Sequence, residues 1–362
     1  MYCEHVPLSW LRCDAVVKEQ REPEPQTWLS QVLQPKLKLS FHSNIAYFKW
    51  ATCHGHLDMC HFFKAWGLTL EEARSHRGWA LHVAAENGHL HVCQFLKDWG
   101  FTLKDARSHR HYALRKAASF GHLEVCQFLK DWGMTLRDAR AEKNYAFRKA
   151  AAHGHLGVCQ FLKQWGLTIR DIRVNRNYAL QRAAKHGHLG VCQLLKDWTT
   201  TLSIPDKPRV IRLTTQDVRS RNCLALKFAA ERGHWKVCQF FQDWTCEETR
   251  ALTLADVRSI KFLLVNVARN GHARVCHVLK NWGFTLQDVR LHHCLALRLA
   301  ARNGHLDVCQ LFREWVDADS STLTLEDLLS GDCSAQRWAA EHGHAHVSRF
   351  LDHWKQQLSR QS

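Results

Sequence analysis

Two residue types with metal-binding chemistry recur along this chain of 362 residues, which contains 26 His and 15 Cys. A histidine follows a glycine nine times, and a cysteine stands four residues after eight of these histidines. At this spacing both side chains share one face of a helix, where imidazole and thiolate can hold a metal ion. A zinc site needs about four converging ligands, whereas equivalent positions of stacked helical units lie roughly 10 Å apart. We therefore expect no metal site and predict that the cysteines are small hydrophobic residues of the core. The cysteines are Cys60, Cys93, Cys126, Cys159, Cys192, Cys238, Cys276 and Cys309.

A tryptophan stands ten residues after each of these histidines. A regular series of aromatic rings can stack nucleic-acid bases or bind a cationic ligand. These tryptophans continue an apolar stripe, however, so packing between neighbouring units is the favoured interpretation. The series is Trp66, Trp99, Trp132, Trp165, Trp198, Trp244, Trp282, Trp315 and Trp354.

Seven arginines form a further series, each two residues after an Asp or Glu. One interpretation is structural, with each arginine paired to that acid or to the acid of the next unit, a contact that contributes little when exposed. The other interpretation is a binding surface. The series is Arg74, Arg107, Arg140, Arg173, Arg219, Arg258 and Arg290.

Sequence motifs of catalysis are missing from the chain. There is no phosphate-binding Gly-x-x-x-x-Gly-Lys-Ser/Thr loop, no Gly-x-Ser-x-Gly turn and no His-Glu-x-x-His pair. The histidines and cysteines keep a regular spacing, whereas a catalytic site would interrupt it. We expect a protein that is not an enzyme and needs no cofactor.

The Gly-His pair marks a unit of 33 residues, because its successive spacings are 33, 33, 33, 33, 46, 38, 33 and 39. Nine units cover residues 43–355, with insertions near 199–213, 245–252 and 316–323. The unit at residues 144–177 shows three segments clearly. Within this unit, Tyr145–His153 is rich in alanine and predicts a first helix. Leu156–Trp165 has an apolar stripe with helical spacing and predicts a second helix, which ends at Gly166. Thr168–Asp171 has the pattern of a capping box and predicts a short third helix.

The ends of the chain lie outside these units. Residues 1–42 are predicted to be an N-terminal cap or a partly disordered segment, and residues 356–362 a polar tail. No apolar run approaches the roughly 18–20 residues that span a membrane, and the N-terminus lacks the apolar core of a signal peptide. We expect an intracellular monomer, cytoplasmic or nuclear, with reduced cysteines.

A 33-residue unit with Ala-Ala-x-x-Gly-His-x-x-Val-x-x-x-Leu resembles the ankyrin repeat, and residues 79–93 match best. The recurring Cys-Gln-Phe-Leu-Lys-Asp-Trp-Gly segment is similar to the homogeneous ankyrin arrays of some large DNA viruses and protists. The resemblance implies a right-handed solenoid in which the histidine after glycine caps its turn and bonds to a neighbouring repeat. Ankyrin repeats usually begin with Thr-Pro-Leu-His and project a β-hairpin, which the third helix largely replaces here. The expected fold class is therefore an all-α solenoid of about nine ankyrin-like repeats.

Charge suggests what such an array binds. Lys and Arg number 50 against 34 Asp and Glu, a net charge of +16 that argues against a strongly basic partner. The excess follows the third and first helices of the central repeats, and the resemblance implies that these helices form a concave face that binds proteins. We therefore hypothesise a scaffold or adaptor that binds an acidic protein surface, with nucleic acid on the same face as the alternative. The candidate contact residues are Arg74, Arg107, Arg115, Lys116, Arg140, Arg148, Lys149, Arg173 and Arg182.

Overall fold

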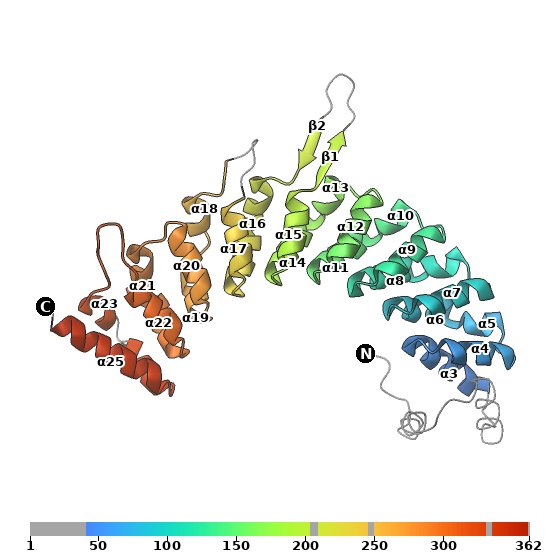
Figure 1. The fold of residues 1–362 in the computed structure, drawn as a ribbon, viewed down its shortest axis with the longest axis horizontal. Helices are drawn as coiled ribbons and strands as arrows, with labels where there is room; N and C mark the ends of the chain where they lie inside the picture. Colours follow the sequence, from blue (N-terminus) through green and yellow to red (C-terminus); the bar gives the residue numbers. More distant parts are fainter. Residues whose placement is uncertain (1–40, 203–208, 245–249, 331–334, 361–362) are drawn as a thin grey trace, which may run out of the picture.

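The computed structural model describes residues 41–202, 209–244, 250–330 and 335–360. They form an arc of stacked helices, with the first described helix, α3, at one end and the last, α25, at the other (Figure 1). All but the last two residues of the segment predicted as an N-terminal cap, 1–42, lie outside the described part, and those two open the first described helix. The last described helix continues to Ser359, so residues 356–359 of the predicted tail are helical.

Each repeat contributes a first and a second helix, as predicted. The first helices are α3 (Phe41–His54), α6 (Ser75–Glu86), the second part of α8 (Leu103–Phe120), α11 (Ala141–Ala152), α14 (Val174–Lys185), the second part of α16 (Thr215–Glu231), α19 (Leu263–Arg269), the second part of α21 (Leu286–Arg302) and α24 (Ala335–Glu341). The second helices are α4 (Leu57–Ala65), α7 (Leu90–Trp99), α9 (Leu123–Asp131), α12 (Leu156–Gln164), α15 (Leu189–Lys196), α17 (Trp235–Gln242), α20 (Ala273–Asn281), α22 (Leu306–Arg313) and α25 (Ala345–Ser359).

The predicted short third helix is also present, and a threonine capping box opens it in every case. It forms the first turns of α8, α16 and α21, and it stands alone as α5 (Leu70–Ala73), α10 (Leu136–Ala139), α13 (Ile169–Ile172), α18 (Leu254–Arg258) and α23 (Leu325–Leu329).

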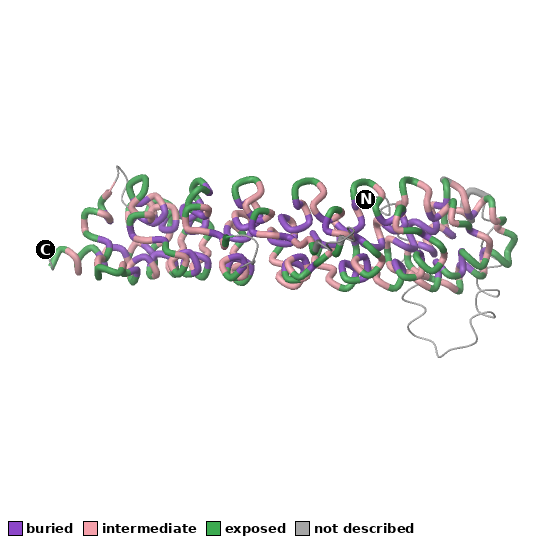
Figure 2. The backbone as a smooth tube through the Cα atoms, turned by 90° about the horizontal axis from the view of Figure 1, so that it is seen from above, coloured by how far each residue is buried: buried purple, intermediate pink, exposed green. Residues whose placement is uncertain are grey.

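First helices pack against the first helices of neighbouring repeats, and second helices pack against second helices. The array therefore has two layers, which appear as two rows when it is seen from above (Figure 2). Figure 1 places the third helices along the outer, convex edge of the arc, which corrects the concave position that the resemblance implied. The bulk of the third helices separates the repeats at this edge. At the opposite edge the repeats approach closely, because the ring of His188 lies against Gly154 of the preceding repeat.

Small residues in the first helices allow close packing. Ala117, Ala118, Ala150 and Ala151 are fully buried. The eight cysteines of the second helices are fully buried as well, which confirms that they are core residues. Burial raises the pKa of the Cys126 thiol to about 12, so it stays neutral at physiological pH.

The longest insertion, near 199–213, contains a β-hairpin that projects from the convex edge (Figure 1). Strand β1 (Thr199–Leu202) pairs antiparallel with β2 (Arg209–Arg212), and Thr199 lies opposite Arg212. Three consecutive threonines and a Val-Ile pair supply the β-branched residues that favour strands. Of the second insertion, residues 245–249 lie outside the described part; the third, near 316–323, is a loop without a strand.

Where a third helix meets the next first helix, the chain makes a left-handed turn that the sequence analysis did not predict. Three consecutive residues have positive φ in each of five repeats: His109–His111, Glu142–Asn144, Asn175–Asn177, Arg221–Cys223 and His292–Cys294. Such a backbone costs roughly 1–2 kcal/mol per residue outside glycine. Side-chain hydrogen bonds offset part of this cost. The Asn144 amide donates to the Asp171 carbonyl at 2.8 Å, and Gln181 donates to the Arg176 carbonyl at 2.7 Å.

Candidate functional site

The seven arginines of the third helices connect successive repeats. Each pairs with the aspartate of the capping box in the next repeat, at N–O distances of 2.6–3.3 Å. The pairs are Arg74–Asp105, Arg107–Asp138, Arg140–Asp171, Arg173–Asp217, Arg219–Asp256, Arg258–Asp288 and Arg290–Asp327. These arginines therefore pair with the acid of the next unit, as the structural interpretation predicted.

The same guanidinium groups also bond to the backbone of the next repeat. Arg107 donates to the Gly133 carbonyl at 3.2 Å, and Arg219 donates to the Ala251 carbonyl at 2.8 Å. The hydrogen bond from Arg219, opposed by burial and reinforced by Thr253, lowers the pKa of Asp256 to about 2. In the last repeat Leu329 occupies the arginine position. No further Thr-Leu-x-Asp segment follows it in the sequence.

Four of the nine candidate residues, Arg74, Arg107, Arg140 and Arg173, therefore belong to this arginine ladder at the convex edge. The other five lie on the first helices α8, α11 and α14: Arg115, Lys116, Arg148, Lys149 and Arg182. The structure thus divides the candidates between two elements, with four at the third helices, where they pair with aspartates, and five on the first helices.

Three tyrosines lie among the five first-helix cations: Tyr112, Tyr145 and Tyr178. The guanidinium of Arg115 lies 4.8 Å from the ring centre of Tyr145, and that of Arg148 lies 5.2 Å from the ring centre of Tyr178. Lys149 lies 5.6 Å from the Tyr145 ring. These distances are in the range of cation–π contacts. We call these five cations and three tyrosines the central basic face.

The tyrosines were not among the residues predicted from the sequence, although their spacing carries a signal. Each stands nine residues before the glycine of its repeat, so their spacing is 33 residues. Repeats on either side replace this tyrosine with Trp79 and Leu224, which confines the Tyr pattern to three consecutive repeats.

Net positive charge is concentrated on the same helices. Residues 109–120, 141–152 and 174–185 contain nine Lys and Arg and a single acid, Glu142. The second helices of the corresponding repeats, α9, α12 and α15, contain three Lys and two acids. In these three repeats the layer of first helices is therefore strongly positive, and the layer of second helices is nearly neutral.

From the second repeat onward, the histidine that follows glycine connects repeats at the edge opposite the third helices, as the resemblance implied, but its side chain makes no hydrogen bond that caps its own turn, which corrects the other half of that expectation. Nε2 of His122 lies 2.9 Å from the Glu86 carbonyl oxygen, and Nε2 of His155 lies 3.0 Å from that of Ser119. Glycine is required beside the histidine, because a Cβ at Gly154 would lie 2.4 Å from Nδ1 of His188. Gly154 also has a φ of +81°, which favours glycine. The imidazole groups of these histidines therefore connect neighbouring repeats through backbone carbonyls.

The tryptophan series packs against the core over most of its length. Trp198, Trp244, Trp315 and Trp354 are buried, Trp99, Trp132, Trp165 and Trp282 are half-buried against core residues, and Trp66 in the first repeat is exposed. Within the described ranges, no three His, Cys, Asp or Glu residues are grouped so that they could hold a metal ion.

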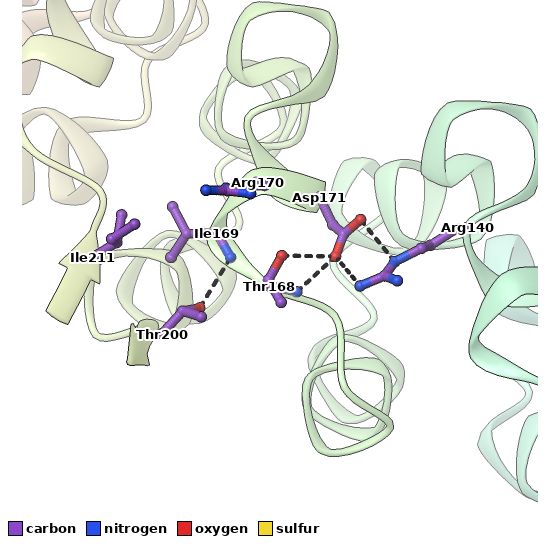
Figure 3. Close-up of a pocket in the computed structure, with 7 residues that line it drawn as sticks. All are labelled: Arg140, Thr168, Ile169, Arg170, Asp171, Thr200 and Ile211. Carbon is purple, nitrogen blue, oxygen red and sulfur yellow. Dashed lines mark hydrogen bonds and ion pairs between the residues drawn. The ribbon is translucent and has the colours of Figure 1, made fainter. Parts of the chain in front are cut away.

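A cavity of about 430 Å³ lies at the base of the hairpin (Figure 3). Thr200 of β1 accepts a hydrogen bond from the backbone N–H of Ile169 at 3.1 Å. Arg140 and Asp171, which face one another in the cavity, are a pair of the arginine ladder. The cavity thus forms where the hairpin rests on α13, and its central charges already neutralise each other.

The family model described as ankyrin repeats (3 copies) matches residues 48–140 and, in an overlapping match, residues 114–206. These ranges include the central basic face. No curated protein matches the sequence. In the part of the chain that the structure describes, no helix is long and apolar enough to cross a membrane.

Proposed function

Since this chain is an ankyrin-repeat protein, and ankyrin repeats are protein-interaction modules, we propose that it is a non-catalytic scaffold whose central basic face binds an acidic surface of another protein. The observation that carries this proposal is the charge of three consecutive first helices, with nine Lys and Arg and one acid. A surface of one sign attracts a partner of the opposite sign and accelerates its association.

The arginine ladder has a different role in this proposal. Its guanidinium groups are paired with aspartates, so binding a partner through them would require the inter-repeat contacts to break. Lys116 is likewise paired, with Glu86, so we assign the partner contacts to Arg115, Arg148, Lys149 and Arg182. The ladder arginines Arg74, Arg107, Arg140 and Arg173 connect the repeats that carry these contact residues.

Nucleic acid is the alternative for the same face, because phosphate groups also bind Lys and Arg. Proteins that bind single strands usually stack bases on aromatic rings. Here the guanidinium groups of Arg115 and Arg148 lie over the rings of Tyr145 and Tyr178. Because these cations cover faces that a base would need, the geometry favours a carboxylate-bearing protein.

Affinity capture with the full chain tests the proposal. Lysate of the source cell is treated with nuclease or left untreated, and the captured material is washed at two salt concentrations. We expect a partner protein that survives nuclease and that the double variant Lys149→Ala/Arg182→Ala no longer retains.

The matched control is Lys130→Ala/Lys163→Ala, which removes the same charge from second helices α9 and α12 and should retain the partner. Equal retention by both double variants would refute the assignment to the central basic face. Loss of all captured material after nuclease would make nucleic-acid binding the function instead.

A further inference from the structure

From the way the chain binds one of its own carboxylates, we infer that the central basic face contains two vacant carboxylate-binding sites, one at Tyr145 and Lys149 and one at Tyr178 and Arg182. The inference rests on the proposed function and specifies its ligand: an extended segment of the partner with regularly spaced Asp or Glu side chains.

One carboxylate-binding site of this kind is already occupied within the chain, by Glu86, the last residue of α6. Its Oε2 accepts a hydrogen bond of 2.6 Å from the Tyr112 hydroxyl, and its Oε1 accepts one of 2.8 Å from Lys116 Nζ. A hydroxyl and an ammonium group from the next repeat thus hold the two oxygens of one carboxylate. Hydrogen bonds with a charged partner are stronger than neutral ones.

The pairing follows the repeat register. Glu86 stands two residues before its glycine, and Lys116 stands five residues before the next one. Glu231 and Asn266 occupy the same two positions at a later junction, where the Asn266 amide donates to Glu231 Oε1 at 2.8 Å. At both junctions a carboxylate at the first position is therefore held by the residue at the second.

The two central junctions keep the receiving residues but lack the carboxylate. Ser119 and Ala152 stand where Glu86 stands one and two repeats earlier. Facing them in register are Tyr145 with Lys149, and Tyr178 with Arg182. Neither serine nor alanine can supply an acidic group, so the site that binds Glu86 is repeated twice without its internal ligand.

Neighbouring cations add to the second vacant site. Arg182 Nε donates to the Tyr178 hydroxyl at 3.0 Å, which leaves the hydroxyl hydrogen available for a carboxylate. Burial raises the pKa of Tyr178, but the hydrogen bond from Arg182 and the charges of Arg182, Lys149 and Arg148 outweigh it, and the pKa is lowered. Positive groups of two repeats therefore act on one hydroxyl.

The spacing of the sites defines the ligand. Packed helices lie about 8–10 Å apart, and an extended peptide in the polyproline II conformation advances about 3.1 Å per residue and returns its side chains to the same side every three residues. Two acidic side chains that occupy adjacent sites should therefore be three residues apart in the partner, in the pattern Asp/Glu-x-x-Asp/Glu.

Fluorescence anisotropy with labelled peptides tests this inference on the full chain. One peptide carries glutamate at every third position among neutral residues, and the other has the same composition with its glutamates contiguous. We expect the first to bind more tightly, and we expect Lys149→Met/Arg182→Met to weaken it about tenfold or more, as expected for the loss of charge-assisted hydrogen bonds. Equal affinity for the two peptides, or no binding of either, overturns the inference.

A second pair of variants fills a vacant site from within. Ala152→Glu places a carboxylate in the register of Glu86, opposite Tyr178 and Arg182, and should weaken binding of the spaced peptide about tenfold. Ala152→Gln has nearly the same volume without the charge and should bind nearly as the unmodified chain does. Equal effects of the two substitutions contradict the inference.

Circular dichroism establishes that both variants fold. If neither does, Glu86→Gln replaces them, because it removes the negative charge that Tyr112 and Lys116 hold from within and should tighten binding of the spaced peptide. No gain from Glu86→Gln then overturns the inference. The proposed function fails separately, if the captured partner protein is retained by Lys149→Ala/Arg182→Ala.

Discussion

An arginine in this chain takes its role from the residue that the next repeat presents to it. Arg140 meets Asp171 and is held at 2.9 Å by an ion pair, whereas Arg115 and Arg148 meet tyrosine rings. The sequence shows both sets as periodic cations. It distinguishes them only when each is matched with the residue that lies one repeat further along.

Arg140→Ala should therefore affect stability more than binding. The pair is partly exposed, with 42% of the Arg140 side chain accessible, so the expected loss of unfolding free energy is only about 1 kcal/mol. Urea denaturation measures the loss, and capture of the partner should be unchanged. A large loss of binding with unaltered stability would place Arg140 in the interface instead.

The stability of the array should fall at mildly acidic pH because of the histidines between repeats. Burial lowers the pKa of His122, His155, His188 and His272, and further histidines of the series add to this effect. The folded state therefore favours neutral imidazole. Above the unfolded pKa of about 6.5 both states are neutral and the stability is complete. As the pH falls below that value, the unfolded chain binds protons first and stability is lost.

Urea midpoints at pH 7.5 and pH 5.5 measure this effect. The ladder aspartates with lowered pKa values, among them Asp138, Asp171 and Asp256, stay ionised over this interval and do not contribute. His155→Asn, which has no titratable group, should reduce the difference between the two midpoints. Identical midpoints for the unmodified chain would contradict the prediction.

At the scale of elements, the local signals in the sequence were sufficient for the helices. The alanine-rich segment, the apolar stripe with the glycine that follows it, and the Thr-x-x-Asp box are each contained within a few residues, and the first, second and third helices of the repeat were predicted from them in that order. The left-handed turns were not. Runs such as Glu142–Asn144 contain no glycine, and their conformation depends on hydrogen bonds to the next repeat that a local pattern does not reveal.

Asn177→Ala tests the cost of such a turn. The Asn177 amide is buried and donates to the Asp217 carbonyl at 3.2 Å, so alanine should lose this bond and also strain a residue with a φ of +63°. We expect a loss of about 1–3 kcal/mol in unfolding free energy. Asn175→Ala is the control, since Asn175 has a φ of +55° but is exposed. If both variants lose the same stability, the backbone alone accounts for the cost.

At the scale of the whole molecule, the sequence predicted the number of repeats and the two-helix stack, but it placed the third helices on the concave side. Curvature arises from the small difference in spacing between the two edges of each repeat. At one edge His188 contacts Gly154, and at the other a third helix intervenes. The overall curvature is the sum of these small differences over all repeats, so no single residue indicates it. The division of the nine predicted contact residues, five on the central basic face and four between repeats, also depends on what the next repeat presents and is not visible within one repeat.

Removal of residues 145–177 tests the modular nature of the array, because it deletes 33 residues in register. Arg140 would then face Asp217, as Arg173 does now at 2.9 Å, and the same types of residue would meet at the new junction. Since each repeat contacts only its neighbours, the shortened chain should fold with a modestly lower melting temperature. It should also bind the spaced glutamate peptide more weakly, because Tyr145 and Lys149 are lost. Deletion of residues 145–155 breaks the register and should abolish cooperative unfolding, as followed by circular dichroism. If both deletions unfold the array equally, stability does not depend on the repeat contacts described above.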